Sequence, residues 1–116
     1  MKQQKKEDDL SIVIVNYNTR ELLRARLKSL QGQIIVVDNA SGDGSMEMVE
    51  KEFPNVDLIK NRQNVGFAKA NNQGIRCTKS TYILLLNTDC EATRQAITES
   101  LKFLETHPEV GVLSCK

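Results

Sequence analysis

Short apolar runs that stop at polar residues alternate along this chain with segments of helical periodicity. Three of the runs are continuous and only four or five residues long, which is typical of strands buried on both faces of a sheet. A fourth run alternates apolar and polar residues, so it predicts a strand nearer an edge. The continuous runs are 11–15, 34–37 and 82–86, followed by polar tips at 16–18, 38–39 and 87–89, and the alternating run is 56–60.

Between these runs, apolar residues recur every three or four positions, which predicts helices. The first helix follows a cap at Asn18 or Thr19, Pro54 stops the second, and the third covers about 65–76. The residues predicted to face the sheet are Leu23, Leu27 and Leu30; Met46, Val49 and Phe53; Phe67, Ala70, Gly74 and Ile75; and Ala96, Ile97, Leu101 and Leu104. Residues 110–114 predict a short last strand, and the polar residues 1–9 predict a disordered arm before a domain over 10–116.

Strands that alternate with helices predict an α/β fold, a Rossmann-like three-layer sandwich around a mostly parallel sheet. We expect the strand order 3-2-1-4, with the short last strand beyond it or at an angle. In such a sheet, ligands bind outside the carboxyl ends of the strands, where the direction of winding reverses. With adjacent strands ~4.8 Å apart, Tyr17, Asp38 and Asp89 would line a crevice about 10 Å wide, which suits a nucleoside diphosphate.

Composition limits which classes of partner and which cellular compartment the sequence predicts. The 116 residues are enough for one small domain, and the net charge of +1 is too weak to predict nucleic acid or an anionic membrane as the main partner. Cys77, Cys90 and Cys115 are odd in number and lack a CxxC spacing, so they predict neither a zinc site nor a disulfide framework and fit a reducing cytoplasm. No apolar run reaches the ~20 residues of a transmembrane segment.

Four sequence blocks stand out, and they read LSIVIVNYN at 10–18, IVVDNASGDGS at 35–45, NVGFAKANNQG at 64–74 and LLLNTD at 84–89. In this order they resemble the blocks of family 2 glycosyltransferases, especially the rhamnosyltransferase-like branch. The resemblance implies an A-type glycosyltransferase fold of the nucleotide-diphospho-sugar transferase type. It also implies inverting transfer of a sugar from a nucleotide diphosphate donor to an acceptor hydroxyl, with Mg²⁺ or Mn²⁺ as cofactor, in polysaccharide biosynthesis.

The resemblance implies a metal ligand at the end of the last block. Asp89 is similar to the last acid of the family's Asp-x-Asp motif, and divalent cations of this kind commonly bind one or two carboxylates plus substrate phosphates. Asn87 stands where the family has the first acid. Its amide can still bind a ribose hydroxyl or a metal-bound water, but we expect a weaker metal affinity because one charge is missing.

The resemblance also implies residues that hold the nucleotide. Tyr17 is similar to the residue that packs against the donor base, and a ring at a strand tip can stack there. Asp38 and Asn39 are similar to the pair that reads the edge of the base, and the amide of Asn39, which both donates and accepts, leaves the base preference open. Asn71 stands where relatives often carry an arginine that faces the diphosphate.

Taken alone, these residues have other interpretations. Asp89 could cap a helix, Asp38 could be an ordinary turn residue, and Tyr17 could be half-buried packing. A non-catalytic α/β scaffold or self-associating module is the alternative function, with a homodimer formed through exposed apolar surface. A phosphoacceptor receiver domain shares the topology, but the chain lacks its matched set of acids and lysine.

The general base that an inverting transferase needs is expected beyond Lys116. We therefore expect the chain to be the donor-binding portion of a longer protein and to be inactive by itself. The longer protein is expected in the cytoplasm or peripherally at the inner face of the membrane.

Overall fold

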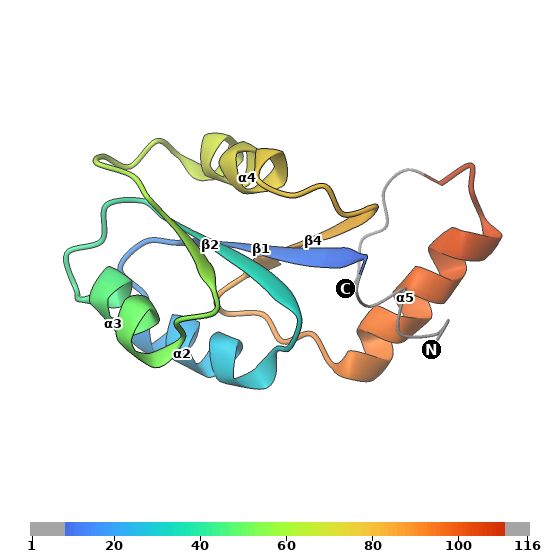
Figure 1. The fold of residues 1–116 in the computed structure, drawn as a ribbon, viewed down its shortest axis with the longest axis horizontal. Helices are drawn as coiled ribbons and strands as arrows, with labels where there is room; N and C mark the ends of the chain where they lie inside the picture. Colours follow the sequence, from blue (N-terminus) through green and yellow to red (C-terminus); the bar gives the residue numbers. More distant parts are fainter. Residues whose placement is uncertain (1–8, 111–116) are drawn as a thin grey trace.

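The fold is a parallel four-stranded sheet with helices on both faces, seen in a computed structural model that describes residues 9–110 (Figure 1). Among these residues the strand order is β3-β2-β1-β4, which confirms the predicted order. The elements are β1 (Leu10–Asn16), α2 (Arg20–Ser29), β2 (Gln33–Asp38), α3 (Ser45–Glu52), β3 (Asp57–Lys60), α4 (Phe67–Arg76), β4 (Tyr82–Asn87) and α5 (Arg94–Thr106). The predicted last strand at 110–114 lies, apart from Val110, outside the described residues.

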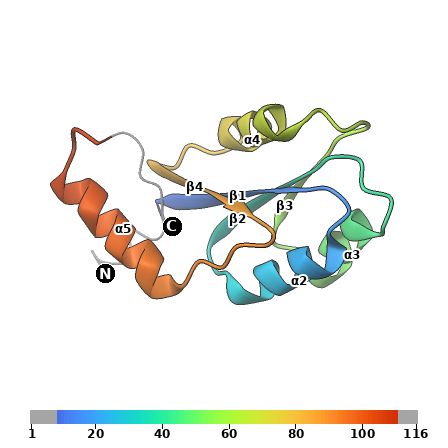
Figure 2. The ribbon, with the colours of Figure 1, turned by 180° about the vertical axis from the view of Figure 1, so that it is seen from behind.

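The sheet separates two apolar layers, as predicted for a three-layer sandwich. Helix α4 covers one face, and α2, α3 and α5 lie on the other (Figures 1 and 2). Because side chains of a strand alternate between faces, Ile12 and Ile14 of β1 join the core under α2, whereas Val13 joins the smaller core under α4. Within residues 9–110, no helix is both long and apolar enough to cross a membrane.

Strand β1 aligns the carboxyl ends of its two neighbours. It pairs in parallel with β2, where Asn16 lies opposite Asp38, and with β4, where Val15 lies opposite Asn87. The turns after β1, β2 and β4 therefore leave the sheet at one edge. This alignment produces the edge at which the candidate site lies.

Strand β4 is less buried than its apolar sequence predicts. Leu85 is 47% exposed, and Leu84 is only partly buried. Among the described residues β4 pairs only with β1, and α4 packs mainly over β1 and β2, so Leu85 on the α4 side of β4 is left largely uncovered. The prediction of a strand buried on both faces is therefore wrong for β4, although it holds for β1 and β2.

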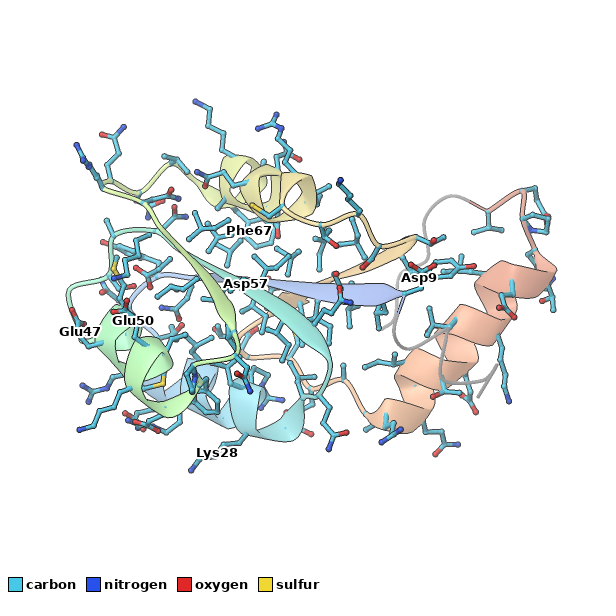
Figure 3. All side chains as sticks on the ribbon, in the orientation of Figure 1. Asp9, Lys28, Glu47, Glu50, Asp57 and Phe67 are labelled. Carbon is cyan, nitrogen blue, oxygen red and sulfur yellow. The ribbon has the colours of Figure 1, made fainter. Side chains whose placement is uncertain are left out.

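Two local predictions also need correction. Phe67 was expected to face the sheet, but it begins α4 with 57% of its surface exposed, and Asn71 takes a buried place instead (Figure 3). Asp9 was assigned to the polar arm, but it belongs to the fold, because its carboxylate accepts a hydrogen bond from Thr81 N (3.0 Å) and its carbonyl accepts one from Tyr82 N (3.0 Å). The rest of the arm, 1–8, lies outside the described residues.

Close packing of α4 on the sheet depends on Gly74. A methyl group at this position would lie 2.4 Å from Cγ1 of Val13, far inside contact distance. Val13 is fully buried in the middle of β1 and cannot move aside without disturbing the sheet. The small residue therefore lets the helix approach the strand.

We predict that Gly74→Ala destabilises the fold by up to about 2 kcal/mol, because an overpacking cost of about 1–3 kcal/mol is only partly offset by the roughly 1 kcal/mol that alanine gains over glycine in a helix. Urea unfolding measures the change. The double variant Gly74→Ala, Val13→Ala should cost less than the sum of the two single variants, because Val13→Ala removes the clashing methyl groups. Simple additivity would contradict the close contact.

Candidate functional site

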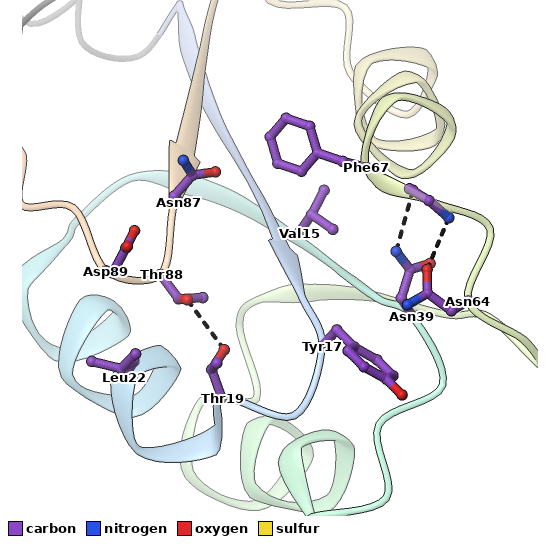
Figure 4. A pocket seen from close by; sticks show the side chains of 11 residues that line it. Val15, Tyr17, Thr19, Leu22, Asn39, Asn64, Phe67, Asn87, Thr88 and Asp89 are labelled. Carbon is purple, nitrogen blue, oxygen red and sulfur yellow. Dashed lines mark hydrogen bonds between the residues drawn. The ribbon is translucent and has the colours of Figure 1, made fainter.

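A pocket of about 480 Å³ opens at the carboxyl edge of the sheet (Figure 4). Tyr17 comes from the turn after β1, and Asn87 and Asp89 come from the end of β4. Phe67, at the start of α4, places its ring over the pocket on the side of Asn87 (Figure 4). Four of the residues that the sequence analysis proposed for a site line this pocket: Tyr17, Asn39, Asn87 and Asp89.

The end of β4 directs Asn87 and Asp89 outward and Thr88 inward. Both outer residues are exposed, whereas Thr88 is 8% exposed and its hydroxyl lies 3.1 Å from that of Thr19 (Figure 4). Asp89 does not cap the next helix, because Thr93 Oγ1 accepts the hydrogen bond from Ala96 N (3.0 Å) and performs that role. The Asp89 carboxylate is therefore available to a ligand in the pocket.

The neighbouring thiol is affected by this carboxylate. Cys90 Sγ lies 3.5 Å from Oδ1 of Asp89. Partial desolvation and the negative charge of Asp89 raise the pKa of the Cys90 thiol. Cys90 is thus expected to stay protonated and uncharged beside the pocket at neutral pH.

Arg26 supports the Asn87–Asp89 turn from the side of α2. Its Nε donates to the carbonyl oxygen of Thr88 at 3.1 Å, and its guanidinium lies 3.8 Å from the Glu91 carboxylate. The arginine is only 9% exposed, which is unusual for this residue type. The sequence analysis did not identify this residue, because the contact joins positions 62 residues apart.

Asp38 lies beneath the pocket and does not line it. It is 1% exposed, and its carboxylate accepts hydrogen bonds from Asn16 Nδ2, Ser41 Oγ and Ser41 N, each at 2.8 Å. A buried carboxylate requires such partners, and the tight turn after β2 supplies them. The prediction that Asp38 faces the crevice is therefore wrong, and the turn-residue interpretation describes its observed contacts.

The two asparagines that were predicted to bind the nucleotide differ in position. Asn39 borders the pocket but is 2% exposed, and its amide bonds to the loop before α4. Asn71 is 5% exposed within α4 and is not among the residues that line the pocket. Asn71 lies three positions before Gly74, which packs against Val13, so helical geometry places both residues on the buried side of α4.

Several residues that line the pocket were not predicted, among them Leu22, Asn64 and Phe67. Asn64 and Phe67 lie within a sequence block that resembles the family, but the periodicity of the helix suggested that Phe67 faces the core. Leu22 follows the first residues of α2 and is 44% exposed at the pocket wall. Exposed apolar residues at a helix start carry no sequence signal that separates them from core positions.

The turn that carries Tyr17 is tied to the turn after β2 by polar contacts. Asn18 N donates to Ser41 Oγ (2.9 Å), and Asn18 Oδ1 accepts from Gly42 N (2.8 Å). One residue further on, Arg20 N donates to Asp43 Oδ2 (2.9 Å), which caps α2 from a distant segment. These contacts fix the backbone that directly follows Tyr17, a residue that is 50% exposed.

The model described as glycosyl transferase family 2 matches residues 11–115. The chain belongs to this family. The family assignment agrees with the resemblance seen in the four sequence blocks.

Two curated relatives are much longer than this glycosyl transferase family 2 chain. An uncharacterized glycosyltransferase of Haemophilus influenzae is 29% identical over 110 residues, which cover 90% of this chain and 37% of that protein. The low-salt glycan biosynthesis hexosyltransferase Agl10 of Haloferax volcanii is 32% identical over 103 residues, with 84% of this chain and 33% of that protein covered. The chain spans about a third of the length of these relatives.

A solved structure of the same architecture supports the fold. The mannosyltransferase PcManGT of Pyrobaculum calidifontis, in complex with GDP-Man and Mn²⁺, superimposes with a TM-score of 0.75 at 21% identity. The match covers 83% of this chain and 32% of that chain. At this identity the likeness establishes the A-type glycosyltransferase fold, in which the sheet order is the one observed here.

The pocket residues fit a divalent cation only if the phosphates of a bound substrate supply part of its coordination. No group of three His, Cys, Asp or Glu side chains that could hold a metal occurs within residues 9–110. Asp89 is the one charged side chain among the described residues that line the pocket. Mg²⁺ is commonly bound through one or two carboxylates plus substrate phosphates, so a single exposed carboxylate is a suitable donor set only if phosphates supply the rest.

Arg26→Met should destabilise the fold by about 1.5–3 kcal/mol, the cost of losing a charged hydrogen-bond donor to a buried carbonyl. Methionine keeps much of the apolar stem of the side chain, so the decrease in the free energy of unfolding measures mainly the lost contact with Thr88. The matched control is Arg24→Met on the same helix, whose arginine pairs with Glu21 and Glu52 at the surface and should cost at most about 1 kcal/mol. Equal losses in urea unfolding would contradict a special role for Arg26.

Asp43 should make stability depend on pH. Burial raises the pKa of its carboxyl, but hydrogen bonds from Ser45 and from Arg20 N outweigh this effect, and the pKa lies below its ordinary value. The ionised carboxylate therefore stabilises the fold above the pKa of the unfolded chain, and this contribution is lost as the pH falls through the lowered pKa. Asp43→Asn should reduce the free energy of unfolding at neutral pH, and the difference should shrink below about pH 4.

Urea unfolding at a series of pH values measures this effect. Glu47→Gln, which changes an exposed acid on α3, is the control and should change the free energy of unfolding at neutral pH by less than Asp43→Asn does. A loss in Asp43→Asn that stays constant down to acid pH would contradict the ionic part of the interpretation.

Proposed function

We propose that the pocket binds the nucleoside diphosphate of a sugar donor, and that the chain is the donor-binding part of an inverting glycosyltransferase that acts on an acceptor hydroxyl. The observation that carries this proposal is the convergence of Tyr17, Asn87 and Asp89 on one pocket at the carboxyl edge of a parallel sheet. Membership of glycosyl transferase family 2 supports the reaction class.

Each of these side chains suits a different part of the donor. The half-exposed ring of Tyr17 can stack on the base, and the exposed amide of Asn87 can bind a ribose hydroxyl. The carboxylate of Asp89 alone would repel a diphosphate, so the proposal includes Mg²⁺ or Mn²⁺ held between the two. When bound, the cation supplies positive charge that offsets the charge developing on the leaving diphosphate.

The buried polar residues have supporting roles in this proposal. Asp38 and Asn71 are too buried to touch the nucleotide in the described conformation, so they act through the residues around them. The solved mannosyltransferase with GDP-Man and Mn²⁺ supports the choice of ligand class and cation.

We assign neither the binding site of the acceptor nor the general base to any residue between 9 and 110. Because the chain spans about a third of its relatives, we place both in the part of the protein that it does not include. We also place the reaction in the cytoplasm, since Cys77 and Cys90 are free and exposed thiols, which suits a reducing compartment.

The cation hypothesis is tested by titrating the chain with UDP and GDP, with and without Mn²⁺. We expect Mn²⁺ to increase the affinity of the wild-type chain for at least one nucleotide by about tenfold or more, or ~1.4 kcal/mol. Asp89→Asn, which removes the charge at almost constant volume, should lose this increase, and its metal-free affinity should be at least that of the wild-type chain because the repulsion between the carboxylate and the diphosphate is removed. Isothermal calorimetry measures both quantities.

The control for this test is Asp57→Asn, which removes an exposed acid on β3 that does not line the pocket (Figure 3). This variant should keep the full effect of Mn²⁺. An unchanged Mn²⁺ effect in Asp89→Asn would remove the metal role. No binding of either nucleotide to the wild-type chain would reject the proposed pocket.

A self-associating module is the second candidate, and one observation favours it. Leu85 is 47% exposed on β4, a strand whose outer edge has no partner among the described residues. Such an edge can pair with a second copy of the chain. Sedimentation equilibrium that shows a dimer in the wild-type chain and a monomer in Leu85→Lys would support this candidate.

A further inference from the structure

The side-chain amide of Asn39 uses most of its hydrogen-bonding groups in contacts with other residues of the chain. Its Oδ1 accepts hydrogen bonds from Asn61 Nδ2 (3.0 Å) and Val65 N (3.3 Å), and its Nδ2 donates to the carbonyl oxygen of Gly66 (3.3 Å). An amide oxygen has two lone pairs, so both are engaged. The side chain of Asn39 therefore has no acceptor left for an N–H group of a base, and the second hydrogen of Nδ2 belongs to a residue that is only 2% exposed.

The three bonds of Asn39 all lead to one loop, which joins β3 to α4. A second layer extends this connection into the helix, because Asn61 Nδ2 donates to Gln73 Oε1 (2.8 Å) and Gln73 Nε2 donates back to Asn61 Oδ1 (2.9 Å). The backbone of Asn61 also donates to the carbonyl oxygen of Asp38 (2.9 Å). We call Asn39, Asn61 and Gln73 the amide clamp.

The clamp holds the part of the loop that forms a pocket wall. Asn64, Gly66 and Phe67 all line the pocket, and Asn39 bonds directly to Gly66 (Figure 4). Gly66 has φ 89° and ψ 168°, a conformation that other residues rarely adopt. Glycine adopts this conformation without strain, so contacts with neighbouring side chains are needed to select it. Two side chains make such contacts, because Asn39 Nδ2 donates to the Gly66 carbonyl oxygen and Asn64 Oδ1 accepts from Gly66 N at 2.9 Å.

From these contacts we propose that Asn39 is a positioning residue. Through Asn61 and Gln73 it holds the Asn64–Phe67 wall against the end of β2, and it does not read the edge of the base. The inference rests on the proposed function in one respect, namely that the pocket receives a nucleotide. The base preference is then set by residues other than Asn39.

This inference separates two effects of substitution. A residue that reads the base changes the ratio of affinities between different nucleotides. A residue that holds the wall changes the affinity for every nucleotide by the same factor, and its partners in the clamp reproduce the effect. Gln73 lies outside the set of pocket-lining residues, so it affects binding only through the clamp.

The experiment compares the wild-type chain with Asn39→Ala, Asn61→Ala and Gln73→Ala, using UDP and GDP as probes. We expect each variant to weaken both nucleotides by a common factor, about tenfold for Asn39→Ala, as for the loss of a buried polar contact. The ratio of the two affinities should stay at its wild-type value. A changed ratio in Asn39→Ala, with wild-type binding in the other two variants, would overturn the inference.

Hydrogen exchange of the ligand-free chain provides a second readout. Asn39→Ala and Gln73→Ala should exchange the amides of residues 64–67 faster, by about tenfold, because the loop opens locally without its contacts. Asn55→Ala, at an exposed position in the turn before β3, is the matched control and should change neither exchange nor binding. Wild-type exchange rates in both clamp variants would overturn the inference even if nucleotides bind.

A conservative variant isolates the contact with Gly66. Asn39→Asp keeps the size of the side chain and its acceptors, but it cannot donate to the Gly66 carbonyl and places a negative charge beside it. We expect faster exchange at 64–67 and an equal loss of affinity for both nucleotides. If the wild-type chain binds no nucleotide, the proposed function fails, whereas exchange at 64–67 still supports or rejects the clamp.

Discussion

The parallel pairing of β1 with β2 on one side and β4 on the other is the constraint on which the site depends. Its register places Asn16 opposite Asp38 and Val15 opposite Asn87, so three strands end at one level of the sheet. The turns that follow these strands must therefore leave from a single edge. Tyr17 and Asn87 are seventy positions apart in the sequence, but the strand ends that carry them are adjacent, so both residues line one pocket.

Burial divides the polar residues at this edge into two groups. Asp38 and Asn39 turn inward, and each needs hydrogen-bond partners because a buried polar group without them is costly. Their partners are the turns themselves, so these side chains determine the shape of the loops. Asn87 and Asp89 turn outward and remain available to a ligand. Residues of the same chemical type thus serve the framework or the pocket, according to the direction in which each side chain leaves the backbone.

The charges around the pocket explain why a cation belongs to the proposal. Arg26 is the arginine directly behind the Asn87–Asp89 turn, but its Nε is bonded to the carbonyl of Thr88. The pocket itself contains a carboxylate, amides, hydroxyls and two exposed aromatic rings. These groups can stack on a base and bind hydroxyls, but they cannot neutralise a diphosphate. A divalent ion shared with Asp89 would provide the missing positive charge.

Apolar periodicity and the chain direction, both readable in the sequence, determined the alternation of strands and helices, the order β3-β2-β1-β4, and the presence of Tyr17, Asn87 and Asp89 at one edge. Only the tertiary structure decided that Asp38 is enclosed, that Phe67 faces the pocket and that Leu85 lies uncovered. These properties depend on contacts between distant segments, such as Arg26 with Thr88 and Asn39 with Val65. Local patterns do not encode which distant segment approaches a turn, and this approach fixes whether a polar side chain is buried or free to bind.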